Sequence, residues 1–234
     1  MSGDLARTLR SADGPSDTLA ARMAAPALVD LVNPATTALV TSEVQHGVVG
    51  ERSALPELAV AAAPMVERLG VLCAAARSAG VRVIHATASR REDGAGSNLN
   101  ARLFRAVRKS PVALLPGSLE SQVVAELGPE PEDLVLNRLH GLSPMAGTDL
   151  DPILRNLGVR TLIVTGVSVN VAITNLVMDA VNLGYQVVLP RDGVCGLPQG
   201  YADAVIDNTL ALLATVTTVD DLVAAWASSP KVSS

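Results

Sequence analysis

The chain has 234 residues and a formal net charge of −5, with 49% hydrophobic, 18% charged and 2% aromatic residues. This length suits one domain with a short extension. Because aromatic residues are scarce, the large core of that domain must be built from Ala, Val and Leu. The acidic balance and the scarcity of aromatic rings argue against nucleic-acid binding, and no apolar run reaches the roughly 18–20 residues that cross a bilayer.

Residues 1–35 predict an N-terminal arm or short helices, because charges, Gly and three prolines interrupt any regular pattern. The first residues lack the apolar stretch of a signal peptide, so we expect a cytoplasmic protein. The two cysteines, Cys73 and Cys195, form no CxxC pair, and the three histidines lie far apart in the sequence. This pattern predicts neither a metal site nor a bound cofactor.

From residue 36 to residue 234, apolar runs and helical stripes alternate and predict a single domain. Strands are predicted at 37–42, 81–86, 133–138, 161–166, 186–190 and 214–217. Helices are predicted at 56–79, 100–109, 118–127, 171–184 and 200–213, with two more beginning at Asp149 and after Thr218. Gly80 and Gly184 fit left-handed helix caps. Right-handed crossovers then predict a doubly wound, three-layer α/β/α sandwich with six parallel strands.

In such a sheet, ligands bind at the carboxyl ends of the strands, near the point where the strand order reverses. The side chains that directly follow predicted strands are therefore candidates for the functional site. They are Glu43, Ser89, Arg138, the segment 167–172 and Asp192.

Three segments around these strand ends carry a resemblance to a known family. ALVTSEVQHGVVG (38–50) is an apolar strand that ends in an acid-x-Gln pattern, and LVLNRLHGLSPMAGTDLDPILRNLGV (134–159) has a Gly-Thr pair before a Leu-rich helix. The most specific segment is TLIVTGVSVNVAITNLVMDAVNLGYQVVLPRDGV (161–194). Together they resemble the isochorismatase-like superfamily, which includes nicotinamidases, other cysteine amidohydrolases and isochorismatases.

The resemblance implies a catalytic role for three positions, and each departs from the family pattern. Glu43 takes the place of the catalytic aspartate, and Arg138 takes that of the lysine, although Leu139 is the alternative alignment. Ala172 takes the place of the nucleophilic cysteine, with the register fixed by Gly166 and the residue after it. Because a methyl group cannot attack a carbonyl carbon, acyl-enzyme chemistry is excluded at that position.

The remaining chemistry centres on Glu43 and a water molecule. Isochorismatases also lack the cysteine, and their acid protonates a vinyl ether; Glu43 could act in that way only if it were protonated. The permanent cation of Arg138 favours the carboxylate instead, so the pair fits a general base or an anion clamp. The alternative is a buried ion pair that only fixes the sheet.

Other polar residues near the strand ends have both a functional and a structural interpretation. His140 is either a neutral base in the pocket or a solvated loop residue. Gln45 either orients a water molecule or forms hydrogen bonds to backbone groups of the loop. Asn98 and Arg102 bind a substrate carboxylate or form a surface salt bridge.

The segment after the fourth predicted strand shapes the oxyanion site in relatives. The resemblance therefore places Ser168, Asn170 and Ala172 beside the substrate, although Ser168 and Asn170 could instead only cap the following helix. Cys195 is a minor candidate for a replacement nucleophile, because no cation near it in the sequence would lower its pKa. Cys73 lies on an apolar helical stripe and is expected in the core.

Three functions are considered. The first is a hydrolase of a small metabolite that uses Glu43 as general acid/base with water and needs no cysteine. The second is a catalytically inactive family member that binds a small ligand or a partner chain. A nucleotide-binding role is disfavoured, because neither GxGxxG nor GxxxxGK[ST] follows a predicted strand. The resemblance also implies a homodimer or homotetramer.

Overall fold

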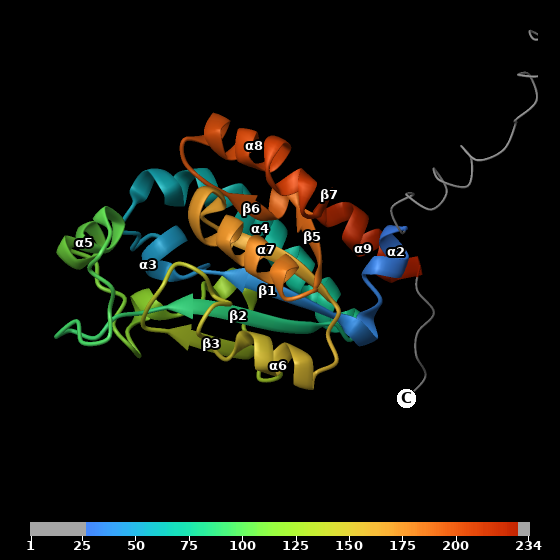
Figure 1. The fold of residues 1–234 in the computed structure, drawn as a ribbon, viewed down its shortest axis with the longest axis horizontal. Coiled ribbons are helices and arrows are strands. Elements are labelled where there is room, and N and C mark those ends of the chain that lie inside the picture. Colours follow the sequence, from blue (N-terminus) through green and yellow to red (C-terminus); the bar gives the residue numbers. More distant parts are fainter. Residues whose placement is uncertain (1–26, 229–234) are drawn as a thin grey trace, which may run out of the picture.

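The computed structural model describes residues 27–228, which form helices on both faces of one sheet (Figure 1). The strand order is β3-β2-β1-β4-β5-β7, with β6 beside β4, and all pairings between these strands are parallel. The strand order reverses between β1 and β4, so the predicted doubly wound α/β class is confirmed. The strands are β1 (Thr37–Ser42), β2 (Arg82–Ala88), β3 (Leu134–Arg138), β4 (Thr161–Val167), β5 (Gln186–Pro190), β6 (Val194–Cys195) and β7 (Thr215–Thr217).

The six predicted strands are all present, with ends that differ by at most two residues. The sheet has a seventh strand, β6, which the sequence analysis did not predict. Two residues are too few to show an alternating or apolar pattern, so only the pairing of Val194 and Cys195 with the end of β4 reveals this strand.

One face of the sheet is covered by α4 (Pro56–Ala79) and α9 (Val219–Ser228), with α2 (Leu28–Leu31) and α3 (His46–Val49) at their ends. Leu69 and Leu72 of α4 are fully buried against this face. Trp226 of α9 packs here too, and its indole N–H donates to the Val32 carbonyl at 3.0 Å. Leu31 and Val32, which belong to the predicted arm, are buried in this core, whereas residues 1–26 lie outside the described residues.

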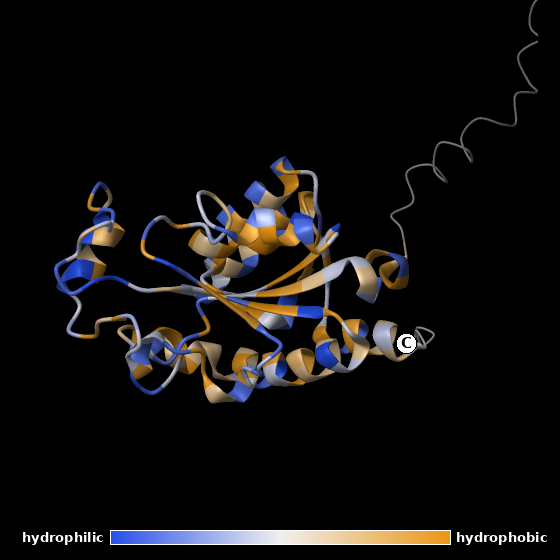
Figure 2. Ribbon diagram, turned by 90° about the horizontal axis from the view of Figure 1, so that it is seen from below, coloured by the Kyte–Doolittle hydropathy of each residue, from blue (hydrophilic) through white to orange (hydrophobic). Residues whose placement is uncertain are grey.

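The other face is covered by α6 (Leu150–Asn156), α7 (Thr174–Asn182) and α8 (Gln199–Asn208). Figure 2 shows the apolar strands edge-on between the two helical layers. Successive residues of β1 point to opposite layers, so Leu39 lies in the α4 core and Val40 in the α7 core. Burial on both sides explains why β1 and β4 are continuous apolar runs.

Helix α4 has the bounds predicted from its apolar stripe. Its end is also as predicted: Gly80 has φ = 80°, and its N–H donates to the carbonyls of Ala76 and Arg77. Against the expectation from the sequence, α4 is long and apolar enough, by length and composition, to cross a membrane. Its buried stripe, which includes Leu69 and Leu72, nevertheless packs on the sheet as a core helix does.

Three helical predictions need correction. The predicted helix at 118–127 is wrong: the segment forms two short 3₁₀ turns, η2 (Leu119–Ser121) and η3 (Ala125–Leu127), because its middle pairs with the loop after β1. The helix predicted at 171–184 begins earlier, as the π-helical turn η4 (Val169–Ile173), and α7 ends before Gly184, whose φ is 90°. The helix predicted at 200–213 is α8 followed by a 3₁₀ turn, η6 (Leu210–Leu212).

A long excursion follows β2. Residues 89–117, which include α5 (Arg102–Lys109), extend away from the layers at the carboxyl end of the sheet (Figures 1 and 2). No residue of α5 is buried. We call residues 89–117 the projecting arm.

The strands β1 and β4 approach each other closely at the point of reversal. Gly166 pairs with Ser42 and has φ = 103°, and a Cβ at this position would lie 2.2 Å from the Ser42 carbonyl oxygen. Both the backbone angle and the space therefore require glycine. This contact fixes how the loops after β1 and β4 begin.

Candidate active site

Glu43 directly follows β1 at the reversal point of the sheet. Its N–H donates to the Ala86 carbonyl of β2 at 2.9 Å, which holds the first residue of the loop against the neighbouring strand. Its φ is 55°, and no other non-glycine residue in the described part of the chain has a positive φ. A left-handed glutamate stores strain that the surrounding structure must offset. Glu43 thus has an enforced position, and its side chain is 23% exposed.

Arg138 ends β3 and reaches past β2 to Glu43. One guanidinium nitrogen, Nη2, donates to the Glu43 carboxylate and lies 3.4 Å from the Leu142 carbonyl. The Arg138 side chain is only 6% exposed. Its Nε and Nη1 atoms are buried and have no hydrogen-bond partner in the described part of the chain. The two catalytic candidates at the ends of β1 and β3 therefore meet, and the arginine keeps unused donors.

Gln45 is fully buried, and its amide is bonded to backbone groups. Nε2 donates to the carbonyls of Ala88 and Ser121 at 2.9 and 2.7 Å, while Oε1 accepts from the Ala88 N–H at 2.9 Å. These bonds tie the loop after β1 to the end of β2 and to η2. Of the two roles considered for Gln45, the geometry matches the structural one, in which its amide forms hydrogen bonds to backbone groups.

The other polar candidates near β2 and β3 have different surroundings. His140 is exposed and lies over Gly147, where a Cβ would be 3.3 Å from its Cε1. Asn98 accepts from the Gly141 N–H at 2.9 Å and so links the projecting arm to the loop after β3. Arg102 is exposed on α5. None of the three has a hydrogen bond or ion pair with Glu43 or Arg138 among the contacts of residues 27–228.

The turn after β4 holds the remaining candidates. Ser168 donates through its hydroxyl to Asn170 Oδ1, and the Asn170 amide lies 3.4 Å from the Leu197 carbonyl. Ala172 is 4% exposed within the π-helical turn η4. Such turns are often found at functional sites. The short apolar pattern after residue 166 could not distinguish this turn from a regular helix start.

The two cysteines lie on α4 and on β6, and β6 contacts the turn η4 that holds Ala172. Cys73 is fully buried in α4, and burial raises the pKa of its thiol to about 12. Cys195 on β6 pairs with Val167, but its side chain packs with the α4 core, and burial raises the pKa of its thiol as well. Neither environment favours a thiolate.

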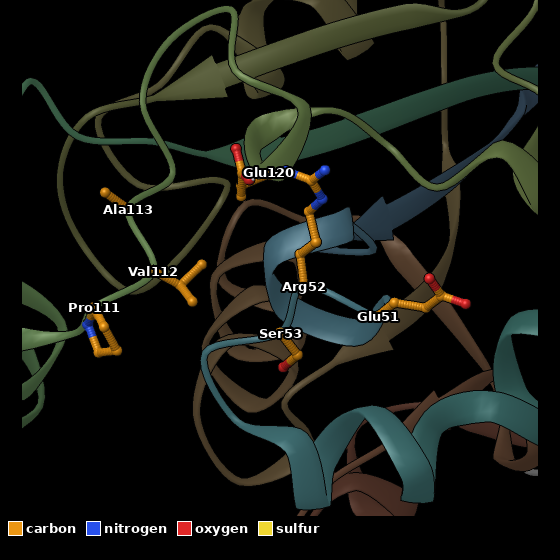
Figure 3. A pocket seen from close by; sticks show the side chains of 7 residues that line it. All are labelled: Glu51, Arg52, Ser53, Pro111, Val112, Ala113 and Glu120. Atoms are coloured by element: carbon orange, nitrogen blue, oxygen red, sulfur yellow. Dashed lines mark hydrogen bonds and ion pairs between the residues drawn. The ribbon is translucent and has the colours of Figure 1, made fainter.

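Two surface hollows lie near the projecting arm. One, of about 530 Å³, lies between the segments around Arg52 and Val112, and Arg52 extends toward Glu120 in an ion pair of 2.8 Å (Figure 3). The second, of about 590 Å³, is lined by Arg91, Glu92, Asp93, Leu115 and Pro116. Neither is lined by Glu43, Arg138 or Ala172. Among residues 27–228, no group of three His, Cys, Asp or Glu side chains could hold a metal ion.

A second charged cluster, which the sequence analysis missed, is buried under β2. Asp133 accepts from Arg77 Nη2 at 2.6 Å, from the Glu130 N–H at 2.8 Å and from His85 Nε2 at 3.3 Å. A carboxylate only accepts, so Nε2 of His85 carries the proton and Nδ1 accepts from the Thr41 hydroxyl at 2.8 Å. The only sequence signals were a histidine inside a predicted apolar strand and an aspartate at the start of another.

The fold and the charged strand ends describe an α/β enzyme scaffold, and sequence comparison identifies the family. Residues 37–221 match the family model of the isochorismatase domain. The chain belongs to the isochorismatase family. The predicted resemblance is thus confirmed at the level of the family.

The curated relatives include amidohydrolases. The ureidoacrylate amidohydrolase RutB of Pseudomonas syringae pv. syringae is 28% identical over 170 residues, which are 68% of this chain and 69% of that protein. RutB of Pantoea ananatis is 30% identical over 174 residues, with 68% and 69% covered. This chain is therefore similar to hydrolases of small metabolites.

Solved structures share the fold. An isochorismatase family protein from Desulfovibrio vulgaris is 27% identical with a TM-score of 0.68, covering 81% of this chain and 98% of that one. A cysteine hydrolase from Pseudomonas syringae pv. phaseolicola has a TM-score of 0.69 at 24% identity and covers 85% and 95% of the two chains. The second likeness concerns the fold alone.

Proposed function

We propose that this chain hydrolyses a small metabolite without a nucleophilic cysteine, with Glu43 as general acid/base and a water molecule as nucleophile. One observation carries the proposal: Glu43 has a strained, left-handed backbone and is paired with Arg138, whose Nε and Nη1 donors are buried and have no hydrogen-bond partner among residues 27–228. Enforced geometry and unsatisfied polar groups cluster at functional sites more often than elsewhere.

The absence of a thiolate rests on the alignment of Ala172 with the cysteine of relatives. Gly166 fixes the register, since it is the residue that the close approach to Ser42 requires. The two cysteines of the chain are held in environments that raise the pKa of their thiols. The reaction therefore has to proceed by direct attack of water rather than through an acyl-enzyme.

In the proposed step, the Glu43 carboxylate takes a proton from a water molecule while the water oxygen bonds to an electrophilic carbon of the substrate. The electron pair of the attacked carbonyl moves to its oxygen, and an N–H of Arg138 stabilises the negative charge that develops there. Collapse of this intermediate expels the leaving group, which takes the proton back from Glu43. A carboxylate paired with a permanent cation suits this base role better than the initial protonation of a vinyl ether.

The relatives suggest the kind of substrate. Ureidoacrylate amidohydrolases act on amide-type bonds by their names, and a base-activated water attacks a carbonyl carbon of this type. We therefore propose a small amide or ester as the first substrate class to test. Under the proposal, Gln45, Ser168 and Asn170 hold the loops around the substrate. Asn98 and Arg102 reach it only after a rearrangement of the projecting arm, and His140 only after a rearrangement of the loop that follows β3.

The second candidate is an inactive family member that binds a ligand or a partner chain. The alignment of Ala172 with the nucleophile of relatives favours it, because a methyl group cannot attack a carbonyl carbon. In either case we propose a cytoplasmic homodimer or homotetramer that binds neither nucleic acid nor membranes.

The test is a hydrolysis screen with panels of amides, esters and isochorismate, using the wild type and Glu43→Gln. Loss of the base should lower kcat by about 10²–10⁴-fold. Glu51→Gln is the matched control, because Glu51 is an exposed glutamate in the next loop. Turnover that Glu43→Gln leaves unchanged contradicts the proposed mechanism. Saturable binding with no turnover by the wild type supports the second candidate.

A further inference from the structure

Arg138 has one counter-charge in the part of the chain that the structure describes. Its only ion pair there is the one with Glu43, and no second cation pairs with that carboxylate. One positive and one negative charge cancel, so the pair is neutral as a unit although Arg138 itself is buried. This neutral sum bears on which ligands the site accepts, because a net charge is costly to hold away from water.

The Arg138 guanidinium also has hydrogen-bonding capacity to spare. Its Nε and Nη1 atoms carry N–H groups, and both atoms are buried without a hydrogen-bond partner among residues 27–228. The Leu142 carbonyl lies 3.4 Å from Nη2, which is long for a hydrogen bond, and it does not serve the other two nitrogens. Buried donors without acceptors are destabilising, so this position favours a ligand that supplies acceptor oxygens.

A second group without a partner directly precedes Glu43. The Ser42 hydroxyl is fully buried and has no hydrogen-bond partner in the described part of the chain. Ser42 lies two residues after Val40 in β1, and Arg138 lies two residues after Leu136 in β3. Val40 belongs to the α7 core and Leu136 packs against it, so Ser42 and Arg138 lie on the same face of the sheet. The unpartnered groups on this face thus include an uncharged hydroxyl, together with a charge pair that is already balanced.

Two kinds of acceptor oxygen compete for the donors of Arg138, the carbonyl of an amide and the carboxylate of an acid. A carboxylate puts a second negative charge on a guanidinium whose charge Glu43 has already cancelled, and like charges repel strongly where water is excluded. An amide carbonyl accepts the same hydrogen bonds and leaves the pair neutral. The arrangement therefore selects an uncharged acceptor.

We propose that Glu43 is a specificity-determining residue: by cancelling the charge of Arg138, it makes the site accept an uncharged amide or ureide carbonyl, and reject a carboxylate, at the position that meets Nε and Nη1. The inference rests on the proposed function in placing the substrate at this pair, and parts of the substrate remote from Arg138 are free to carry charge. Because Nε and Nη1 are buried, the loop that follows β3 shifts when the ligand enters. Among the described residues, its only hydrogen bond to the guanidinium is the long one to Leu142.

The same charge balance favours release of the product. An amide enters the site uncharged. The carboxylic acid formed from it gives its proton to the released amine at neutral pH, and the resulting carboxylate is the species that the pair rejects. Glu43 thus assists release of the product after it has acted as the base.

The first test compares ligands that differ mainly in charge. Acetamide with acetate, and benzamide with benzoate, are pairs of similar shape, and saturation-transfer NMR measures their dissociation constants at about pH 7.5, where the acids are ionised. For the wild type, we expect each carboxylate to bind at least about tenfold more weakly than its amide. Glu43→Gln should reverse this preference, because Arg138 then has no counter-charge, and should bind carboxylates at least about tenfold more tightly than the wild type does.

Further variants keep the test independent of folding. Glu43→Asn also removes the charge, and asparagine adopts the left-handed backbone of this position readily, so it should show the same reversal with a wild-type circular dichroism spectrum. Arg138→Met in the Glu43→Gln background should abolish the carboxylate binding that Glu43→Gln gains. Glu51→Gln is the matched control, because it removes an exposed carboxylate and should keep the wild-type preference.

The inference and the proposed function fail separately. If Glu43→Gln loses turnover but keeps the wild-type preference for amides, the charge selection is wrong and the proposed reaction stands. If the preference reverses as expected but no substrate of the hydrolysis panels is turned over, the proposed reaction fails and the charge selection stands. Three results overturn the inference: carboxylates that bind the wild type as tightly as their amides, a preference that neither charge-removing variant changes, and no binding of either class to any variant.

Discussion

The chain holds two clusters of charged side chains against its sheet, and the clusters differ in how completely their polar atoms are bonded. Under β2, Asp133 accepts hydrogen bonds from Arg77, His85 and a backbone N–H, and its side chain is 2% exposed. At the carboxyl edge, Arg138 is almost as deeply buried but uses only Nη2, and leaves Nε and Nη1 without partners in the described part of the chain.

This difference separates a structural cluster from a candidate functional one. A buried network in which the central carboxylate is fully bonded stabilises one arrangement of the core. A buried cation with unused donors is destabilising by itself, so its retention calls for another explanation, such as a ligand or a reaction. We therefore expect a carboxylate-to-amide substitution to reduce the free energy of unfolding more at Asp133 than at Glu43.

The largest effect is expected for Asp133→Asn. The amide leaves Arg77 without its counter-charge and disturbs His85, which should lower the free energy of unfolding by about 3–5 kcal/mol. Urea unfolding followed by circular dichroism measures it. Asp93→Asn is the control, because its pair with Arg91 is exposed on both sides and should contribute nothing measurable. A wild-type midpoint for Asp133→Asn would show that the cluster does not support the core.

A smaller effect on stability is expected for Glu43→Gln, the same carboxylate-to-amide change at the edge. The introduced amide keeps an oxygen that can accept from Arg138, and the side chain lies partly in solvent, so the loss should be about 1–2 kcal/mol. The same urea titration gives the value. If Glu43→Gln were as destabilising as Asp133→Asn, the edge pair would be a structural ion pair, and the comparison would fail.

The smallest effect concerns pH. Burial lowers the pKa of His85, against the hydrogen bond to Asp133, so the folded chain binds fewer protons than the unfolded chain below the ordinary value of 6.5. The contribution of neutral His85 to the free energy of unfolding should therefore be fully present above pH 6.5 and should be lost as the pH falls below that value. His85→Gln should flatten this slope, whereas His140→Gln, at an exposed position, should not.

At still lower pH, the free energy of unfolding depends on the protonation of Asp133. Although burial alone would raise the pKa of Asp133, the hydrogen bonds from Arg77 and from the Glu130 N–H lower it below 3.8. The contribution of the Asp133 carboxylate to the free energy of unfolding is thus present above pH 3.8 and is lost only as the pH falls further.

The assignment to His85 can be contradicted separately. It fails if the free energy of unfolding of His85→Gln still changes with pH between about pH 5 and 6.5.

Much of the fold could be predicted because its signals are local. Continuous apolar runs indicated six strands, and Gly80 marked the end of α4, since periodicity and left-handed caps are properties of neighbouring residues. The helix predicted at 118–127 failed for the opposite reason. Its middle residues pair with Val44 and Gln45, about eighty positions earlier in the chain, and no local pattern records that contact.

The candidate site divides in the same way. The sequence placed Glu43 directly after one strand and Arg138 at the end of another, and the parallel sheet brings those strand ends to one edge, so their meeting followed from topology. It could not decide the partners of Gln45, because a buried amide is satisfied equally well by a ligand or by backbone. The sequence also could not show that Nε and Nη1 of Arg138 have no hydrogen-bond partner among residues 27–228, since this depends on side-chain packing around the loop after β3.

The sequence alone determined the family and the doubly wound sheet, because these are read from the order and spacing of residues. The tertiary structure decided which charges are bonded and which side chains remain uncovered: the Asp133 cluster, the strained Glu43 and the helix α5, none of whose residues is buried. Burial and hydrogen bonding join segments far apart in the chain, so they become visible only when the layers are packed.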